Sequence, residues 1–357
     1  MHRIVGIMVM LLCSAPSVHA EDFLNWLETA TGSQHRDEEF VEVDGAELIT
    51  LESRESEMYP KVSPDGKYFL TLSTNKHHHI ITRRLVENGD PINVVIEHDA
   101  QALDSIAWYG DDIVTFLSYR ADSLGLWQKP VDRGVVKRLH GRLDGELIDP
   151  VLLGDGSIIA VRLHAPEQRL HSKYKKSKQP NLAFDNWNIK GKQPHLVRIS
   201  ANGAEEELAA GLNPSLSADG ERVVFSMQSE RNWHLFMMNV DGSDLIQLTE
   251  GHSIDVQPTW SPDGKSVAFT SNRADEDEDD RHGAKANWDV WMISYDGRNL
   301  TRLTTDKARD GAPEFAKNGR IYFHSDRKVD KAARADHQVR GSTKGFHVWS
   351  VMLPAIN

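Results

Sequence analysis

Histidine is the residue type in this sequence with the widest choice of chemical roles. There are 17 histidines, and imidazole is both a common metal ligand and a general acid or base near neutral pH. His79, His195, His234 and His347 occupy equivalent positions in an internal repeat, and Asp289 fills that position in another copy. Because positions that recur with a repeat report packing, we interpret this set as structural, bonded to the backbone or to Ser or Thr of a neighbouring strand.

The remaining histidines are weaker candidates for a metal site. His77 and His78 are adjacent, so on a strand their side chains point to opposite faces and are poorly placed to hold one ion. Others lie at predicted strand ends or in loops, namely His164, His171, His252 and His324. We therefore predict no bound metal and no cofactor, with a divalent cation as the open alternative.

Two clusters of like charge stand out. Residues 275–280 are an unbroken acidic run, and four lysines gather at positions 173, 175, 176 and 178. The acidic run lacks the spaced glycine and carbonyl pattern of a calcium loop, which supplies about six to eight oxygen ligands. We interpret both clusters as solvated loops. A glycan or lipid headgroup at the lysines is the alternative.

The first residues predict export. His2 and Arg3 precede an apolar run from Ile4 to Cys13, and small residues follow at positions 18–20, as in a secretory signal peptide. We expect residues 1–20 to be removed and the protein to be periplasmic or secreted. Removal of the signal peptide would also remove Cys13, the one cysteine in the sequence. No later segment approaches the roughly 20 consecutive apolar residues that a membrane-spanning helix needs.

The net charge of -12 at pH 7 argues against nucleic acid as a partner, because nucleic-acid-binding surfaces are basic. We predict a monomer whose partner is a periplasmic or envelope protein or peptide.

The elements that position these side chains follow from a repeat. Residues 59–66, 213–220 and 257–264 share the pattern Pro-x-x-Ser-x-Asp-Gly, and weaker copies lie at 108–111, 150–156 and 313–319. Asp219 and Asp263 are 44 residues apart, within the range of about 40 to 50 for a four-stranded propeller blade. The apolar residues alternate in short runs, which predicts strands. The sequence is therefore predicted to be all-β, a six-bladed β-propeller with four-stranded blades.

The ends of the chain predict how the ring closes. The last copy stops after its third strand at residues 350–353, whereas residues 43–51 closely copy the fourth-strand sequence at 240–248. We expect this N-terminal strand to complete the last blade, which hides two sheet edges. The predicted organisation is a signal peptide at 1–20, an arm with a possible short helix at 21–38, and one propeller at 39–357.

A propeller gathers the starts of its inner strands around one axis, and this places a candidate binding site. The residues expected at the channel mouth are Tyr59, Asp104, Asp149, Asn213, Asp255, Gln257 and Asp310. Four of them are acidic, so they predict an electronegative funnel for a basic peptide or a cation. The alternative is that these polar groups only bond ordered water.

The repeat resembles that of the periplasmic TolB propeller and its relatives, through residues 258–264 and the Phe-Thr-Ser-Asn-Arg run at 269–273. The likeness covers about residues 40 to 357 and implies a binding scaffold for proteins or peptides. A separate N-terminal domain like that of TolB has no counterpart in the sequence.

A second likeness concerns residues 184–187 and 193–197, which resemble a blade from the propeller domain of prolyl-oligopeptidase-type peptidases. Catalysis in those enzymes belongs to a hydrolase domain with a Gly-x-Ser-x-Gly elbow, and this sequence contains no such motif.

We therefore predict an exported binding scaffold, more an interaction module than an enzyme. Two alternatives stay open. One is a propeller polysaccharide lyase or hydrolase that uses channel histidines and acids. The other is an accessory propeller that works with a separate serine hydrolase.

Overall fold

The computed structural model describes residues 41–43, 45–51, 56–74, 79–98, 104–141, 143, 145–164, 184–189, 191–229, 231–274, 286–337 and 343–354. The predicted signal peptide and arm, His77, His78, His171, the lysine cluster and the acidic run lie outside these residues. No helix in the described ranges is long and apolar enough to cross a membrane.

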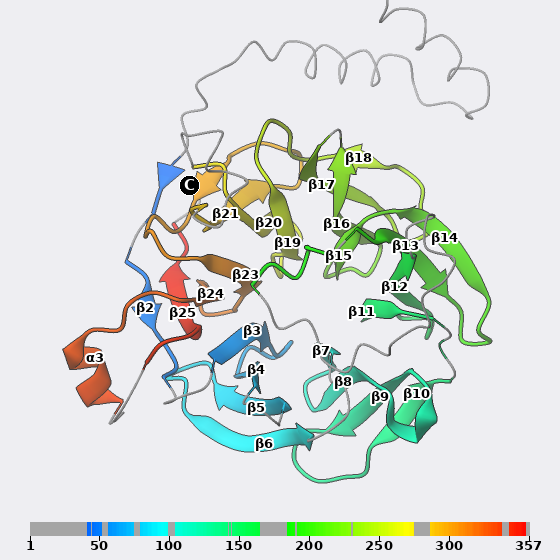
Figure 1. The fold of residues 1–357 in the computed structure, drawn as a ribbon, viewed down its shortest axis with the longest axis horizontal. Helices are drawn as coiled ribbons and strands as arrows, with labels where there is room; N and C mark the ends of the chain where they lie inside the picture. The colour runs from blue at the N-terminus through cyan, green and yellow to red at the C-terminus, as the bar shows by residue number, and fades with distance from the viewer. Residues whose placement is uncertain are drawn as a thin grey trace, which may run out of the picture. The chain divides into compact units, whose positions relative to one another are not determined.

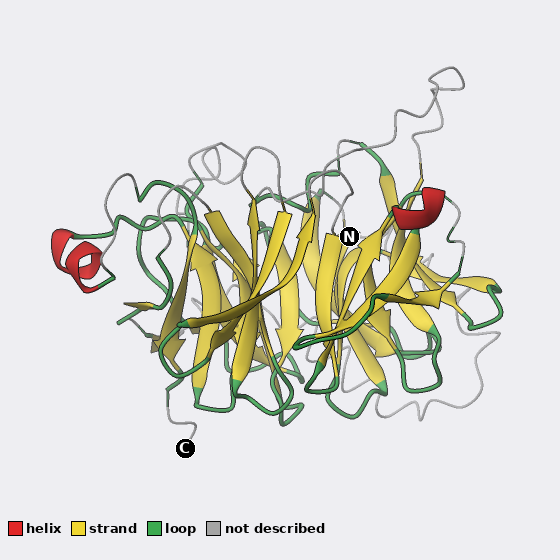
Figure 2. Ribbon diagram, turned by 90° about the horizontal axis from the view of Figure 1, so that it is seen from below, coloured by secondary structure: helices red, strands yellow, loops and turns green. Residues whose placement is uncertain are grey.

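Six antiparallel sheets are arranged in a ring, with the first strand of each sheet nearest the axis (Figures 1 and 2). This confirms the predicted six-bladed propeller. Blade 1 comprises β3 (Ser56–Val62), β4 (Tyr68–Thr74), β5 (His79–Leu85) and β6 (Pro91–His98). Blade 2 comprises β7 (Asp104–Tyr109), β8 (Ile113–Ser118), β9 (Gly125–Pro130) and β10 (Lys137–His140). Blade 3 comprises β11 (Leu147–Leu152), β12 (Ile158–His164), β13 (Gln193–Ile199) and β14 (Glu205–Ala210).

The second half of the ring has the same organisation. Blade 4 comprises β15 (Leu212–Leu216), β16 (Arg222–Ser229), β17 (Asn232–Asn239) and β18 (Ile246–Gln247). Blade 5 comprises β19 (Asp255–Trp260), β20 (Ser266–Ser271), β21 (Asp289–Ser294) and β22 (Thr301–Arg302). Blade 6 comprises β23 (Asp310–Phe315), β24 (Arg320–Ser325), β25 (His347–Met352) and β2 (Glu47–Leu48). A short 3-10 helix, η1 (Arg120–Asp122), and a six-residue helix, α3 (Lys331–Asp336), lie in connections.

The Ser-x-Asp-Gly pattern forms the turn between the first and second strands. In blade 1 the Ser63 hydroxyl donates to Asp65 Oδ1 at 2.6 Å and accepts from the Tyr68 backbone N–H at 3.0 Å. Gly66 has φ +78°, a conformation that glycine adopts without steric cost. Ser261 and Asp263 make the same 2.6 Å bond in blade 5. The repeated motif therefore sets where each hairpin turns.

The N-terminal strand closes the ring as predicted. Strand β2 pairs antiparallel with β25, with Glu47 opposite Ser350 and Leu48 opposite Trp349. The Glu47 carboxylate also binds Arg320 at 2.7 Å. Strands from the two ends of the propeller are thus joined within blade 6.

One further strand was not predicted. Strand β1 (Val41–Glu42) adds in parallel to β22 at the outer edge of blade 5, and Glu42 binds Arg302 at 3.0 Å. The N-terminal segment therefore contacts blade 5 before it completes blade 6.

From the repeat we expect six aromatic side chains to be largely buried between blades, and four of them are. Phe236, Phe269, Trp291 and Phe323 are buried between blades, whereas Trp127 and Trp349 are half-buried. The last two lie beneath guanidinium groups: Arg138 is 5.4 Å from the Trp127 ring centre and Arg327 is 5.7 Å from that of Trp349. Arginine, rather than another apolar side chain, covers these rings, and cation–π attraction makes that favourable.

Candidate functional site

A ring of six residues in the left-handed backbone conformation surrounds the axis, one on the first strand of each blade. Their φ values lie between 49° and 54°, where residues other than glycine are uncommon. The residues are Tyr59, Ser105, Asp149, Asn213, Gln257 and Ala312. Each lies where the pairing between first and second strands shifts register, as at a β-bulge. The bulge turns one side chain per blade toward its neighbours around the axis.

These residues, which we call the polar ring, are hydrogen-bonded from blade to blade. The Ser105 hydroxyl accepts from the Asp149 backbone N–H at 2.8 Å and donates to the Asp149 carboxylate at 3.1 Å. Asn213 Nδ2 donates to Asp149 Oδ2 at 3.2 Å, and Asn213 Oδ1 accepts from the Gln257 N–H at 3.4 Å. Gln257 Oε1 accepts from the Ala312 N–H at 2.8 Å. One polar chain thus links blades 2 to 6.

Blade 6 uses a histidine where its ring residue is apolar. The Tyr59 N–H donates to Nδ1 of His324 at 3.2 Å. His324 is fully buried, and burial, together with the charge of Arg309, lowers its pKa to about 3. His324 is therefore a neutral structural acceptor near pH 7, although the sequence predicted only that it lies at a strand end or in a loop.

A cavity of about 370 Å³ lies on the axis and runs along the inner strands from the polar ring. Beyond the ring its wall is a collar of four prolines, Pro150, Pro214, Pro258 and Pro313. Lys61 and Glu314, 3.1 Å apart, line the next level. Trp108 and Trp260 also line the wall. The cavity therefore has a polar floor, an apolar collar and a charged rim.

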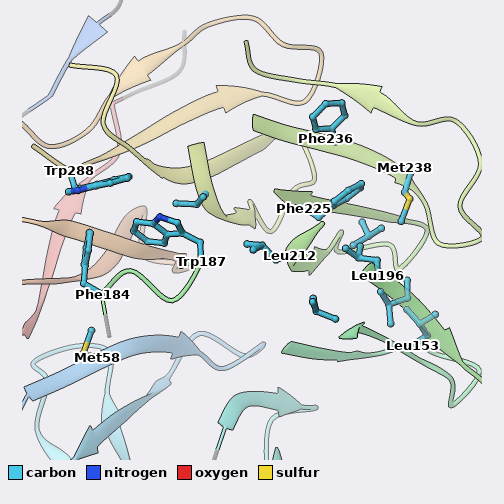
Figure 3. Close-up of a cluster of buried hydrophobic side chains, with 14 of the residues drawn as sticks. Met58, Leu153, Phe184, Trp187, Leu196, Leu212, Phe225, Phe236, Met238 and Trp288 are labelled. Atoms are coloured by element: carbon cyan, nitrogen blue, oxygen red, sulfur yellow. The ribbon is translucent and has the colours of Figure 1, made fainter. Parts of the chain in front are cut away.

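Residues 184–189, in the connection between β12 and β13 of blade 3, lie at the floor of this cavity. Phe184 stacks on Phe346 with ring centres 5.6 Å apart, and Trp187 packs on Trp288 at 4.8 Å. Figure 3 shows Phe184 between Met58 and Trp288, with Trp187 beside them.

Within the same segment, Asn186 lines the cavity and accepts a 3.0 Å bond from Gln257 Nε2. The segment therefore covers the polar ring on the side of blades 5 and 6.

Two of the predicted acids do not line the cavity. Asp255 and Asp310 are fully buried, and each binds an arginine that follows the second strand of its own blade, Arg273 at 2.7 Å and Arg327 at 2.6 Å. Both acids lie two positions before a polar-ring residue. In a regular strand the two side chains would point to the same side, but the bulge turns the ring residue away from the acid. Both positions were expected at the channel mouth, but only the ring position lines the cavity.

The same acidic position lies against the third strand of the preceding blade. His234 Nδ1 is 3.6 Å from Asp255 Oδ2, and His347 Nδ1 is 3.4 Å from Glu57 Oε2. The recurring histidines at these two junctions are structural, as interpreted, but their partners are carboxylates of the next blade. Asp289 holds the equivalent position opposite Asp310.

The electrostatics of these junction acids differ. Burial raises the pKa of Asp255, but Arg273, His234, Ser271 and Thr249 outweigh it and hold the pKa at about 2. Burial raises the pKa of Asp289 to about 7 against the opposing Arg302, and the charge of Asp310 adds to the rise. An acid in place of a histidine therefore gives the junction of blades 5 and 6 a group that titrates near neutral pH.

Of the predicted site residues, the structure brings Tyr59, Asp149, Asn213 and Gln257 together around the cavity. Asp104 begins β7, one position before Ser105, and its side chain is outside the described set. Lys61, Glu314 and Asn186 were missed. The period of two along an inner strand would have pointed to the first two, because each lies two positions after a ring residue.

No group of three or more His, Cys, Asp or Glu among the described residues is arranged to hold a metal ion. His164 and His195 are in edge contact with ring centres 5.1 Å apart, and His195 Nδ1 lies 2.7 Å from Glu207.

Comparison with known proteins finds similarity over part of the repeat. The TolB beta propeller domain model matches residues 202–277. A protein TolB homolog of Chlorobaculum tepidum is 31% identical over 107 residues, which are 27% of this chain and 24% of that protein. The uncharacterized peptidase YuxL of Bacillus subtilis is 29% identical over 154 residues, 36% of this chain and 23% of that protein. The matches thus span about a quarter of the length of each relative.

The solved structures show the fold. TolB from Acinetobacter baumannii superposes with a TM-score of 0.52 at 18% identity, covering 74% of this chain and 58% of that one. The observed ring is thus a six-bladed β-propeller, and part of it, residues 202–277, is similar to the TolB beta propeller domain.

Proposed function

We propose that this chain is an exported, periplasmic propeller that binds a segment of an envelope protein or a peptide in its axial cavity. The observation that carries the proposal is the cavity itself, with its polar floor, proline collar and charged rim on the axis. A volume of about 370 Å³ lies at the lower end of ligand pockets, about 300 to 1,000 Å³. It suits one extended segment or a few side chains. The likeness to TolB-type repeats supports a binding role.

The ligand enters from the rim formed by Lys61 and Glu314. Residues 184–189 cover the polar ring on one side through Phe184, Trp187 and Asn186, which makes the floor the less open end. Tyr59, Asp149, Asn213 and Gln257 then contact the ligand tip. Asp255 and Asp310 do not contact the ligand. Their ion pairs with arginine fix the inner strands that carry the polar ring.

A pair of matched variants tests this. Ala107 lines the cavity on β7, so Ala107→Trp fills the channel, whereas Ala332 is exposed on α3 and Ala332→Trp adds the same side chain outside it. Wild type and both variants are used for affinity capture from a periplasmic extract, with thermal unfolding as the check on folding.

We expect a partner that is retained by wild type and by Ala332→Trp and lost with Ala107→Trp. The same partners in all three samples, with all three folded, would overturn the channel as the binding site.

A further inference from the structure

The acids of this propeller fall into two groups by their counter-charges. Four acids are wholly buried and each binds an arginine at 2.6 to 2.7 Å. These pairs are Glu57–Arg84, Asp255–Arg273, Asp289–Arg302 and Asp310–Arg327. Asp149 differs, because the hydrogen bonds to its carboxylate come from the neutral donors Ser105 and Asn213. It is half-buried and lines the cavity.

Lys61 is the cationic side chain that acts on Asp149, but it does not form an ion pair with the Asp149 carboxylate. Lys61 acts on Asp149 only through its charge, and its ammonium group binds Glu314 at 3.1 Å. Burial raises the pKa of Asp149, and the bonds from Ser105 and Asn213 offset this only in part. A carboxylate in this position gains from a cation supplied from the cavity.

From this geometry we propose that Asp149 receives a primary ammonium group carried by the ligand. The inference rests on the proposed function and names the chemistry of its ligand. A carboxylate offers about four lone-pair sites, of which Ser105 and Asn213 occupy two, so acceptor capacity remains.

The collar and the donors already present favour ammonium over guanidinium. Each Asp149 oxygen already accepts one bond, whereas a guanidinium pairs best with two parallel acceptors in a fork. An ammonium is a compact charge on an aliphatic stem, and the stem would lie against the prolines of the collar. A lysine side chain and a free amino terminus both carry this group.

Small amines test the inference directly. Hexylammonium is titrated into ¹⁵N-labelled protein and followed by the indole N–H signals of Trp108 and Trp260, which line the cavity. The matched probes are 1-hexanol and N-acetylhexylamine, which keep the stem and lose the charge. Two further probes then distinguish a lysine side chain from an amino terminus. Nα-acetyl-lysine methylamide carries only the side-chain ammonium, and alanylalanine amide carries only the terminal one.

We expect hexylammonium to bind and the two neutral probes to bind at least about tenfold more weakly, as for loss of a charge-assisted hydrogen bond. Asp149→Asn keeps the shape and should weaken hexylammonium by a similar factor, whereas Asp112→Asn, at an exposed turn, should leave it unchanged. In wild type, affinity should rise with pH as Asp149 ionises, an independent readout if the variant is unstable.

Equal affinity for hexylammonium and 1-hexanol, or no loss in a folded Asp149→Asn protein, would overturn the inference. Its failure is distinguishable from failure of the channel proposal. If the partner is lost with Ala107→Trp but retained with Asp149→Asn, the channel proposal is supported and the ammonium inference is rejected. If amines bind selectively but the partner is retained with Ala107→Trp, the ammonium site is supported and the channel proposal is rejected.

Discussion

Asp289 occupies the position that His234 and His347 occupy at two other blade junctions. Its carboxyl group therefore titrates where those junctions have an imidazole. With a pKa raised to about 7 by burial, against about 3.9 in an unfolded chain, the native state holds a proton that the unfolded state has lost. Stability from this group is therefore full below about pH 4 and falls as pH rises toward 7, by up to about 1.4 kcal/mol per pH unit.

Asp289→Asn removes this titration. We expect the free energy of unfolding in urea to fall less between pH 5 and pH 7.5 in the variant than in wild type. Parallel losses in both proteins would show that Asp289 is ionised throughout.

His324 gives the opposite dependence. Its pKa is lowered to about 3 by burial and by Arg309, so below about pH 6.5 the unfolded state takes up a proton that the native state excludes. The stability from this group is full above that pH and is lost as pH falls toward 3.

The His324→Gln variant retains a side-chain acceptor for Tyr59 and does not titrate. Its deficit in unfolding free energy relative to wild type should be larger at pH 7.5 than at pH 5. A deficit that is the same at both pH values would contradict the buried neutral state.

At the scale of the element, one threonine after each of three outer strands makes the same bond. Thr50, Thr249 and Thr304 are buried, and their hydroxyls accept from the backbone N–H of Val348, Leu235 and Val290 at 2.9 to 3.1 Å. The N-terminal strand therefore reproduces the bond that an ordinary fourth strand makes.

Replacing each threonine by valine keeps the shape and removes the acceptor. Each change should cost about 1 to 3 kcal/mol of unfolding free energy, the cost of an unsatisfied buried donor, measured by urea denaturation. If Thr50→Val were neutral while Thr249→Val was costly, β2 would not be equivalent to a fourth strand.

The strands and turns could be predicted because the same residues mark them in each copy of the repeat. Turn residues such as Asp65 and Gly66 recur with fixed spacing, and residues 43–51 copy a fourth strand, so the blades and the closure could be read directly. Strand β1 has only two residues and no copy elsewhere, so nothing in the sequence marked its parallel pairing.

The candidate site was predictable only in part. Alignment of the repeats placed Asp149 and Asp255 near the axis, yet it could not tell which side chain enters the cavity. That choice depends on the left-handed bulge, which turns the ring residue away from the acid two positions earlier. The pairing of Asp255 with Arg273 joins residues 18 positions apart and needed the folded blade to be seen.

At the scale of the whole molecule, the ring gathers six single residues into one site that no blade contains. The polar ring is bonded from blade to blade, and residues 184–189 reach across from blade 3 to cover it. We therefore expect the axis, rather than the outer edges of the blades, to be the binding surface.

Site-specific photo-crosslinking distinguishes binding at the axis from binding at the outer edges. A benzophenone side chain is placed at Ser215, which lines the cavity, and separately at Leu245, which is 49% exposed near the outer edge of blade 4. If the partner binds at the axis, it is crosslinked from Ser215 and not from Leu245, through a peptide with a lysine or a free amino terminus. A partner crosslinked only from Leu245 would show that it binds at the outer edge instead.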